Sequence, residues 1–228
     1  MEPVRLRLFM NLLCRLSVSC LNWDVPWLFW PAIRHQPKLC EAFSRMDPTR
    51  RVLGVIRPTV ESIGALTATR HVGVLATPGT ILSESYPLEI HKLFPDVQVT
   101  GMPCPMWVPL VENNEFASEG ADYFVRKYID GLLSQDPEID TLILGCTHYP
   151  LLLDKIRRFT PSHIRLVAQG EYVARSLKDY LSRHTEMNSR CTRNGHCEFL
   201  TTESVSKFRE SASVFLHEQI QVRSITLE

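Results

Sequence analysis

The chain has 228 residues, enough to bury a sizeable core in one large domain or two small ones. Hydrophobic residues make up 44% and charged residues 22%, as in ordinary soluble globular proteins, and no apolar run is long enough to span a bilayer. Lys plus Arg equals Asp plus Glu, 25 each, so no net charge draws the chain to nucleic acid or to an anionic membrane.

The first 45 residues differ from the rest of the chain in the pattern of their hydrophobic residues. Arg5, Arg7 and Arg15 interrupt the apolar start, so we expect no signal peptide there. Further on, Trp23, Trp27 and Trp30 lie within eight residues and show no helical or alternating period. The seven cysteines are too few and too widely spaced for a disulfide framework, which favours reduced thiols and a cytoplasmic location. They are Cys14, Cys20, Cys40, Cys104, Cys146, Cys191 and Cys197.

From residue 51 onward the pattern predicts alternating strands and helices. Strands are predicted at 51–56, 71–77, 96–104, 140–145 and 164–170. Helices are predicted from Pro58 to 69, after the turn that begins at 78, and at 115–135, 149–160 and 171–184. The tail adds two strands, within 196–204 and 221–228, around a helix at 205–217. The fold class is therefore α/β, with parallel sheets and flanking helices.

The segment "TLILGCTHYP" (141–150) carries the chemistry. Its buried strand ends at Gly145, and Cys146 follows at the carboxyl end, where ligands bind in parallel α/β sheets. Thr147 and His148 are expected at the start of the next helix. A thiol near a helix N-terminus and a histidine ionises more easily than a free thiol, so it can exchange protons near neutral pH. A buried structural cysteine beside a capping threonine remains the alternative.

Two further segments extend the pattern: "VGVLATPGTILSESY" (72–86) and "CPMWVPLVEN" (104–113), in which Glu112 is expected just ahead of a helix. Together with "VLGVIRPTVE" and "LILGCTHYPLL", their order and spacing resemble the glutamate racemases of the aspartate/glutamate racemase superfamily. The resemblance covers about residues 46 to 185. It implies a two-domain racemase architecture with an incomplete N-terminal domain.

The resemblance also implies an activity: cofactor-independent interconversion of L- and D-glutamate, which supplies D-glutamate for bacterial peptidoglycan. In this family one thiol removes the α-proton and a second thiol on the opposite face returns one. Carried over, Cys146 is one base, Thr147 and His148 bind the substrate or assist the thiol, and Glu112 tunes or orients that base. No cofactor and no metal are expected, and a homodimer is left open.

Three other groups of residues are interpreted as structural. Thr77 and Thr80 are expected to cap a turn, and Cys104 is expected to be structural because it precedes a proline. A zinc site at Cys191, His196 and Cys197 is disfavoured, because no further pair completes it.

The amino-terminal part departs from the family pattern. The family's "DSG" and "PYG" segments and its first thiol motif, similar to "ACNTA", are missing. Back-translation of 22–37 in a shifted frame permits "LGCALVVLACNTASA", which contains that motif. We hypothesise that a frameshift replaced this part of the chain, to be tested by resequencing the gene.

The domain prediction follows from these boundaries. Residues 1–45 form an aberrant segment, 58–166 form a complete α/β domain with the "GCTH" motif, and 46–57 with 167–228 form the rest of the other domain plus an extension. Two alternatives stay open: an aspartate racemase or related amino-acid isomerase, and a catalytically dead binding protein that keeps half of a site.

Overall fold

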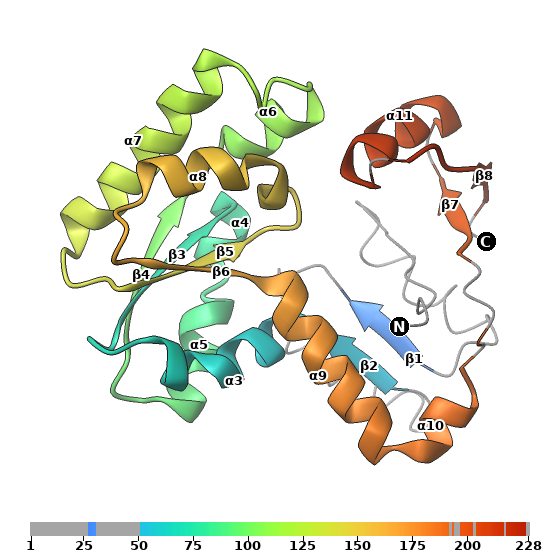
Figure 1. Cartoon of the computed structure of the whole chain (residues 1–228), viewed down its shortest axis with the longest axis horizontal. Helices are drawn as coiled ribbons and strands as arrows, with labels where there is room; N and C mark the ends of the chain where they lie inside the picture. The colour runs from blue at the N-terminus through green and yellow to red at the C-terminus, as the bar shows by residue number, and fades with distance from the viewer. Residues whose placement is uncertain are drawn as a thin grey trace. The chain divides into compact units, whose positions relative to one another are not determined.

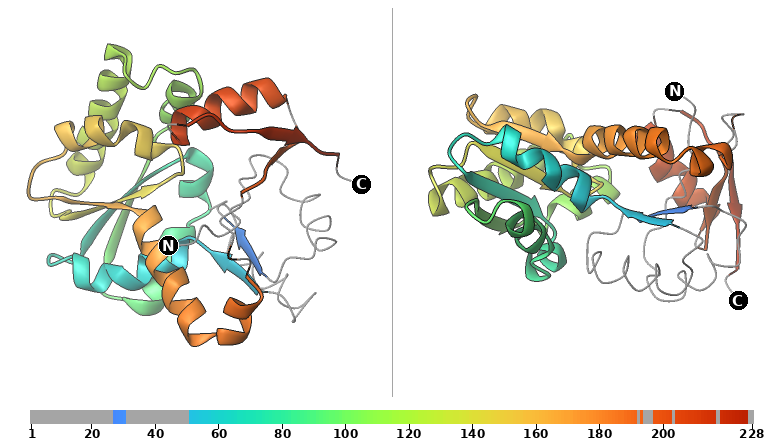
Figure 2. Two further views of the ribbon diagram at one scale, coloured as in Figure 1. Left: turned by 45° about the vertical axis from the view of Figure 1, so that its right-hand side comes forward. Right: turned by 90° about the horizontal axis from the view of Figure 1, so that it is seen from below.

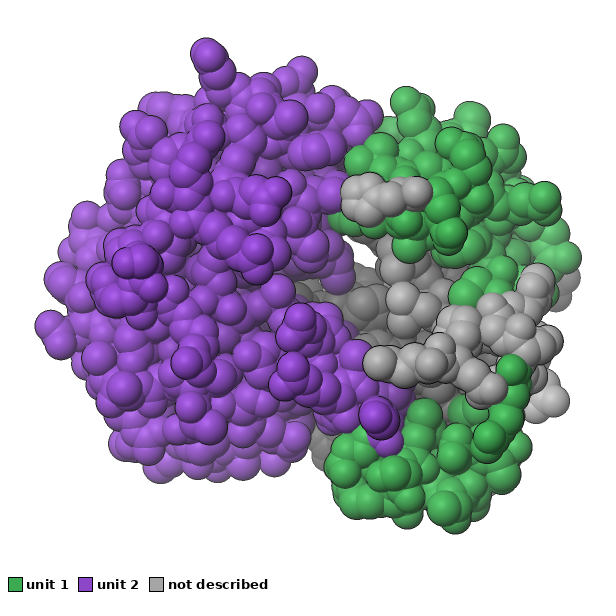
Figure 3. Space-filling model, in the orientation of Figure 1, with its two compact units in different colours: residues 1–31, 40–53, 179–228 green, residues 32–39, 54–178 purple. Residues whose placement is uncertain are grey.

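The computed structural model describes residues 27–30, 51–191, 193, 197–202, 204–216 and 218–226, and for 27–30, 51 and 52 it describes the backbone alone. These residues fall into two compact units (Figure 3). The larger unit is formed by Gly54–Lys178, and the other by 27–30, 51–53 and the described residues from 179 onward. The segment 1–45, predicted to be aberrant, therefore lies outside the described residues except for 27–30, and Cys14, Cys20 and Cys40 lie outside them as well.

The larger unit is built on a four-stranded sheet in the order β4-β3-β5-β6, with every neighbouring pair parallel. Its strands are β3 (His71–Ala76), β4 (Gln98–Pro103), β5 (Thr141–Gly145) and β6 (Arg165–Ala168). All five residues of β5 are buried, which explains the continuous apolar run that predicts a central parallel strand. The predicted α/β class with a parallel sheet is confirmed.

Helices cover both faces of this sheet (Figure 1), and two further views show the same arrangement (Figure 2). One face carries α7 (Glu119–Gln135) and α8 (Leu153–Phe159), and the other carries α3 (Ile56–Leu66) and α5 (Ser85–Leu93). Short elements link them: α4 (Pro78–Leu82), α6 (Trp107–Glu112) and the 3-10 helix η1 (Tyr149–Leu152). Parallel strands need such crossovers, because consecutive strands must start from the same edge.

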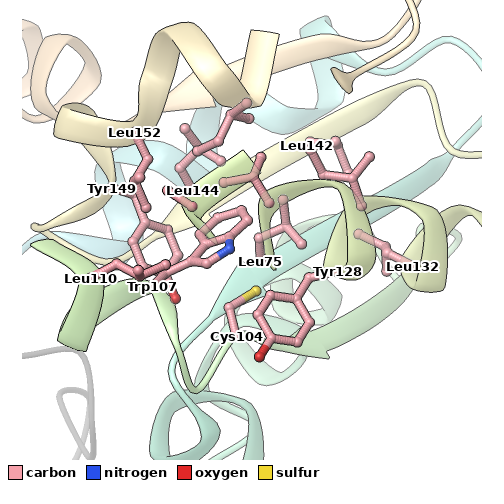
Figure 4. Packing of buried hydrophobic residues seen from close by; sticks show 14 of the residues in the cluster. Leu75, Cys104, Trp107, Leu110, Tyr128, Leu132, Leu142, Leu144, Tyr149 and Leu152 are labelled. Atoms are coloured by element: carbon pink, nitrogen blue, oxygen red, sulfur yellow. The ribbon is translucent and has the colours of Figure 1, made fainter. Parts of the chain in front are cut away.

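The core lies between the sheet and the α6–α7–α8 layer (Figure 4). Trp107 is fully buried at its centre, and its ring meets Tyr149 edge-on with centroids 4.6 Å apart. The indole Nε1 donates to the Phe124 carbonyl at 3.3 Å, so the only polar atom of this side chain has a partner. Leu75 of β3 and Leu142 of β5 pack from the sheet side.

The strands of the second unit are short. β1 (Trp27–Trp30) pairs with β2 (Arg51–Gly54), and β7 (Phe199–Thr201) pairs in parallel with β8 (Val222–Ser224) across α11 (Val205–Leu216). α9 (Gln169–Arg183) begins in the larger unit, which ends at Lys178, and the short α10 (Thr185–Ser189) follows it before β7. The predicted tail of strand, helix and strand is confirmed, with shorter strands than expected.

Several predicted boundaries were wrong. α3 begins at Ile56 rather than at Pro58, because the strand before it ends at Gly54. The helix predicted from 115 begins at Glu119, where the Ser118 side chain accepts from the Ala121 amide at 3.2 Å. α6 and α10 were not predicted, so Glu112, which does precede α7, also ends a helix of its own. A strand also occupies 27–30, where no period was found.

Candidate active site at the carboxyl edge of the sheet

The four strands of the larger unit end at one edge of the sheet. Ala76 of β3 pairs with Pro103 of β4 on one side and with Gly145 of β5 on the other. The residues that follow the strands therefore gather at this edge. They are Thr77 after β3, Cys104 after β4, Cys146 after β5 and Gln169 after β6. This is the edge at which open parallel sheets bind ligands.

Gly145 fits only because it has no side chain. A Cβ at this position would lie 3.0 Å from Tyr86 Cε2, 3.3 Å from the Tyr86 hydroxyl and 3.1 Å from Ala76 Cβ. Tyr86 is itself buried, so its ring has little room to move aside. The glycine therefore lets the tyrosine approach the backbone directly before Cys146.

Cys146, His148 and Glu112 form a line of three groups. The Cys146 Sγ lies 3.7 Å from His148 Nδ1, and His148 Nε2 lies 3.5 Å from Glu112 Oε1. His148 is buried, Cys146 is half-buried, and the Glu112 side chain is about half exposed. The structure thus brings together three of the residues expected at the site, two of them from one motif and the third from α6.

The contact with Glu112 indicates the tautomer of His148. A carboxylate only accepts hydrogen bonds, so Nε2 carries the proton and Nδ1 presents its lone pair to the thiol. Burial lowers the pKa of His148, and the nearby Glu112 carboxylate opposes that effect only in part. The imidazole is therefore neutral near pH 7 and can accept the thiol proton. The imidazolium formed in that step would be stabilised by Glu112.

The expectation of an easily ionised thiol is wrong for Cys146. Burial raises its pKa to about 11, although the backbone amides of His148 and Thr147 favour the thiolate. The local sequence shows the amides and the histidine, whereas the cost of burying a charge depends on how the folded chain covers the thiol. Thr147 and His148 also lie before η1 rather than inside it, with His148 as its N-cap residue.

Of the other residues that the sequence singled out, one is open to a ligand and the rest have structural contacts. Thr147 is exposed and available to a ligand. Thr77 is the N-cap of α4, and its hydroxyl accepts from the Thr80 amide at 3.3 Å, so the predicted hydroxyl-capped turn is confirmed. Cys104 is buried, and its thiol donates to the Met102 carbonyl at 3.5 Å, which agrees with the structural role expected of it.

The sequence did not single out Tyr86 and Gln169. The Gln169 side-chain amide donates a hydrogen bond to the Tyr86 hydroxyl across 83 positions of the sequence. Neither residue belongs to the "GCTH" motif, and nothing in the local pattern links them. Only the helical spacing of 85–93, which buries Tyr86 beside Ile90, carried a signal for the tyrosine.

Metal ligation was also considered from the sequence. Within the described part of the chain, no group of three or more His, Cys, Asp or Glu side chains is placed to hold a metal ion. His196, one member of the disfavoured zinc site, lies outside the described residues. None of the described helices is both long and apolar enough to cross a bilayer.

Comparison with known proteins gives a consistent set of relatives. No family model matches the chain. The glutamate racemase of Streptococcus mutans is 36% identical over 176 residues, covering 77% of this chain and 66% of the relative. That of Shouchella clausii is 37% identical over 166 residues, covering 73% of this chain and 59% of the relative. The chain thus spans just under two thirds, or less, of the length of these relatives.

Solved structures show the same likeness. A glutamate racemase from Francisella tularensis, crystallised in complex with D-glutamate, superposes with a TM-score of 0.81 at 25% identity, over 94% of this chain and 78% of that one. A glutamate racemase isoform from Bacillus anthracis gives a TM-score of 0.81 at 29% identity, over 93% and 78% of the two chains.

Proposed function

This chain belongs to the glutamate racemase family and has the aspartate/glutamate racemase fold, and on that premise we propose that it acts on glutamate, with Cys146 as the base on one face of the α-carbon. The observation that carries the proposal is the line from Cys146 through His148 to Glu112 at the carboxyl edge of the sheet. A neutral imidazole that faces a thiol can take its proton and leave a thiolate that acts as a base.

The chemistry explains why a buried thiol suits this role. The α-proton of an amino acid is very weakly acidic, so the base must be strong when it acts. A thiol whose pKa is about 11 gives a thiolate that is a stronger base than a free cysteine thiolate. At rest the proton stays on the thiol, because the pKa of His148 lies well below that of Cys146. Transfer to Nδ1 of His148 therefore forms a small population of thiolate, and Glu112 stabilises the imidazolium formed with it. Exclusion of water from the reacting atoms would lower the barrier further.

The other site residues complete the proposal. Thr147, exposed beside Cys146, would bind the substrate together with His148, as the resemblance implies. The relative from Francisella tularensis was crystallised with D-glutamate, which supports glutamate as the ligand. We further propose that the reaction needs no cofactor, takes place in the cytoplasm and serves peptidoglycan synthesis.

Inversion requires a second base on the opposite face of the α-carbon. No cysteine in the sequence is followed by Asn-Thr, as in the family's first thiol motif. We therefore propose that this chain exchanges the α-proton of one enantiomer, while full racemisation depends on a base that the described residues do not identify.

Proton NMR in D₂O tests this proposal. The purified chain is incubated separately with L-glutamate and D-glutamate, beside Cys146→Ala and, as a matched loss of another thiol, Cys197→Ala. We expect exchange of the α-proton of one enantiomer, reduced at least about a hundredfold by Cys146→Ala and unchanged by Cys197→Ala.

The outcomes separate the alternatives. Deuterium incorporation with inversion would mean that the chain also holds the second base. Binding of glutamate without exchange, in a folded sample, would overturn the catalytic proposal and leave a binding protein.

A further inference from the structure

Lys155 joins α8 to the loop between α6 and α7. Its ammonium donates to the Ala117 carbonyl at 3.1 Å and to the Ser118 carbonyl at 3.0 Å, and it also pairs with the Asp122 carboxylate. These three acceptors match the three donors of an ammonium group. The Lys155 side chain is only 16% exposed, so water competes little for these contacts. The lysine therefore holds the loop, residues 113–118, against α8.

Hydrogen bonds continue from this loop into α6. The amide and the hydroxyl of Ser118 both donate to the Glu115 carbonyl, at 3.0 and 2.7 Å. The Glu115 amide in turn donates to the Leu110 carbonyl of α6 at 2.7 Å. Glu112 is the last residue of α6, so it lies along the chain between Leu110 and the loop that these bonds tie to it. The loop and the end of α6 therefore behave as one piece.

The other end of this link begins at the histidine of the site. His148 is the N-cap residue of η1, and α8 begins at Leu153, directly after η1 ends. Lys155 therefore bridges the segment that follows His148 and the segment that follows Glu112. The side chains of these two residues meet at 3.5 Å, between Nε2 and Oε1.

Burial holds the two ends of α6 differently. Trp107, its first residue, is fully buried in the core. In contrast, Glu112, residues 113–115 and Ala117 are exposed, and Phe116 is only half-buried. Exposed segments have few apolar contacts to fix their position. The polar link through Lys155 supplies an anchor at the end of the helix where burial supplies little.

We propose that Lys155 is a positioning residue for the contact between Glu112 and His148: by holding the loop after α6 against α8, it keeps the carboxylate within reach of the imidazole. The inference rests on the proposed function, because His148 accepts the thiol proton in that reaction. Lys155 acts through Glu112, and not on the thiol or the imidazole directly.

The direction of a pKa change in His148 separates this role from a simple effect of charge. The Glu112 carboxylate raises the pKa of His148, so loss of the contact lowers it. Loss of a positive charge elsewhere removes a repulsion and has the opposite sign. On the other side of the ring, the Cys146 thiol stays protonated at neutral and acidic pH, because burial raises its pKa to about 11.

The test is a titration of His148 by proton NMR, with the imidazole signal assigned from His148→Gln. Glu112→Gln sets the scale, because it removes the carboxylate charge. Lys155→Met keeps the long stem and removes the ammonium, and we expect it to lower the pKa of His148 by at least half as much as Glu112→Gln does. The double variant should show the same pKa as Glu112→Gln alone, because Lys155 acts through that carboxylate.

Arg158→Gln is the matched control. Arg158 lies on the same helix and pairs with the same Asp122 carboxylate, and its guanidinium stacks on the Phe159 ring at 4.5 Å instead of reaching the loop. Its loss removes one positive charge and should not lower the pKa of His148. A Lys155→Met chain with native circular dichroism and an unchanged or raised pKa of His148 would overturn the proposal, as would an equal fall in Arg158→Gln.

Lys155→Gln decides the question if Lys155→Met does not fold. Its shorter side chain keeps two donors and loses the charge, so the pKa of His148 should fall by less than in Glu112→Gln. A pKa equal to that of the wild-type chain, or above it, would then count against the proposal. The titration needs no substrate. Absence of α-proton exchange in the wild-type chain therefore argues against the proposed function alone, and the pKa of His148 decides this inference separately.

Discussion

Both edges of the sheet in the larger unit, at the amino and at the carboxyl ends of the strands, carry polar side chains. The hydrogen bonding of these side chains differs between the two edges. At the amino edge, buried Asp136 accepts from His71 Nδ1 at 2.9 Å, from the Thr100 hydroxyl at 3.1 Å and from the Glu138 amide at 3.2 Å. At the carboxyl edge, the Cys146 thiol lies 3.7 Å from its imidazole partner.

The same contrast holds for a second pair of residues. Asp140, before β5, accepts from the amides of Ala68 and Thr69 at 2.6 and 2.8 Å and from the Thr141 hydroxyl at 2.9 Å. Beyond β5, the buried hydroxyl of Tyr149 has no nitrogen or oxygen partner among the described residues, and its polar neighbour is the Cys104 thiol, a weak hydrogen-bonding group. Saturated polar groups hold the strands together, whereas loosely partnered ones are free to take part in chemistry.

Gly145→Ala, at the carboxyl edge, should produce the largest effect. It should lower both the stability of the fold and the reactivity of Cys146, so it would break the comparison between the two edges. The new Cβ meets the Tyr86 ring and Ala76, neither of which can yield easily. We expect a loss of about 2 kcal/mol in the free energy of unfolding, typical of overpacking, measured by urea denaturation. The rate of α-proton exchange should fall as well, because the crowded backbone lies directly before Cys146. Gly170→Ala is the control, because no atom lies within 4 Å of its Cβ position, and an equal loss there would contradict the packing argument.

Asp140→Asn, at the amino edge, should lower the stability of the fold and leave the reactivity of Cys146 unchanged, which would sharpen the comparison between the two edges. Burial would raise the pKa of Asp140, but the hydrogen bonds from Thr69, Thr67, Ala68 and Thr141 outweigh it and lower the pKa to about 2. We expect a loss of about 2 kcal/mol at pH 7, since these four donors lose a charged acceptor.

The pH dependence of Asp140→Asn follows from the sign of that shift. A lowered carboxyl pKa stabilises the fold fully above the unfolded pKa of about 4, and this contribution is lost as the pH falls through about 2. The difference between variant and wild type should therefore shrink from pH 4 to pH 2. Asp96→Asn, which removes an exposed ion pair with Arg70, should change stability little at any pH. A constant difference across that range would contradict the assignment.

Glu112→Gln should have the smallest effect. It should lower the rate of α-proton exchange and leave the stability of the fold unchanged. The carboxylate is half exposed, so water screens its interaction with His148. We expect about a threefold lower rate of α-proton exchange, because the imidazolium loses a weakly held partner. Glu115→Gln, an equal change of charge three residues away on an exposed position, should leave the rate unchanged. A similar fall in both variants would indicate a general effect of charge.

Local patterns predicted most of the fold and the motif at its edge. Strands such as 141–145 are continuous apolar runs, and "GCTHYP" directly marks the end of one of them. The short helices α6 and α10 escaped prediction because five or six residues carry too little periodicity. Glu112 was placed beside the thiol by resemblance, and the structure supplies the contact through His148.

Long-range contacts and burial could not be read from the sequence. The hydrogen bond between Tyr86 of α5 and Gln169, directly after β6, joins residues 83 positions apart along the chain. The raised pKa of Cys146 depends on how deeply the folded chain covers the thiol, whereas local sequence shows only the favourable amides and the histidine. The pKa of Cys146 and the contact between Tyr86 and Gln169 therefore became known only from the structure.

Trp107, at the centre of the larger unit's core, also gives that unit an optical reporter. The other three tryptophans, Trp23, Trp27 and Trp30, lie in the first 30 residues. Replacing those three with phenylalanine would leave one indole, shielded from solvent and 4.6 Å from the ring of Tyr149. Its emission should be blue-shifted in the native state and move to the red on unfolding, so that fluorescence follows the unit that carries Cys146 without a signal from the other tryptophans.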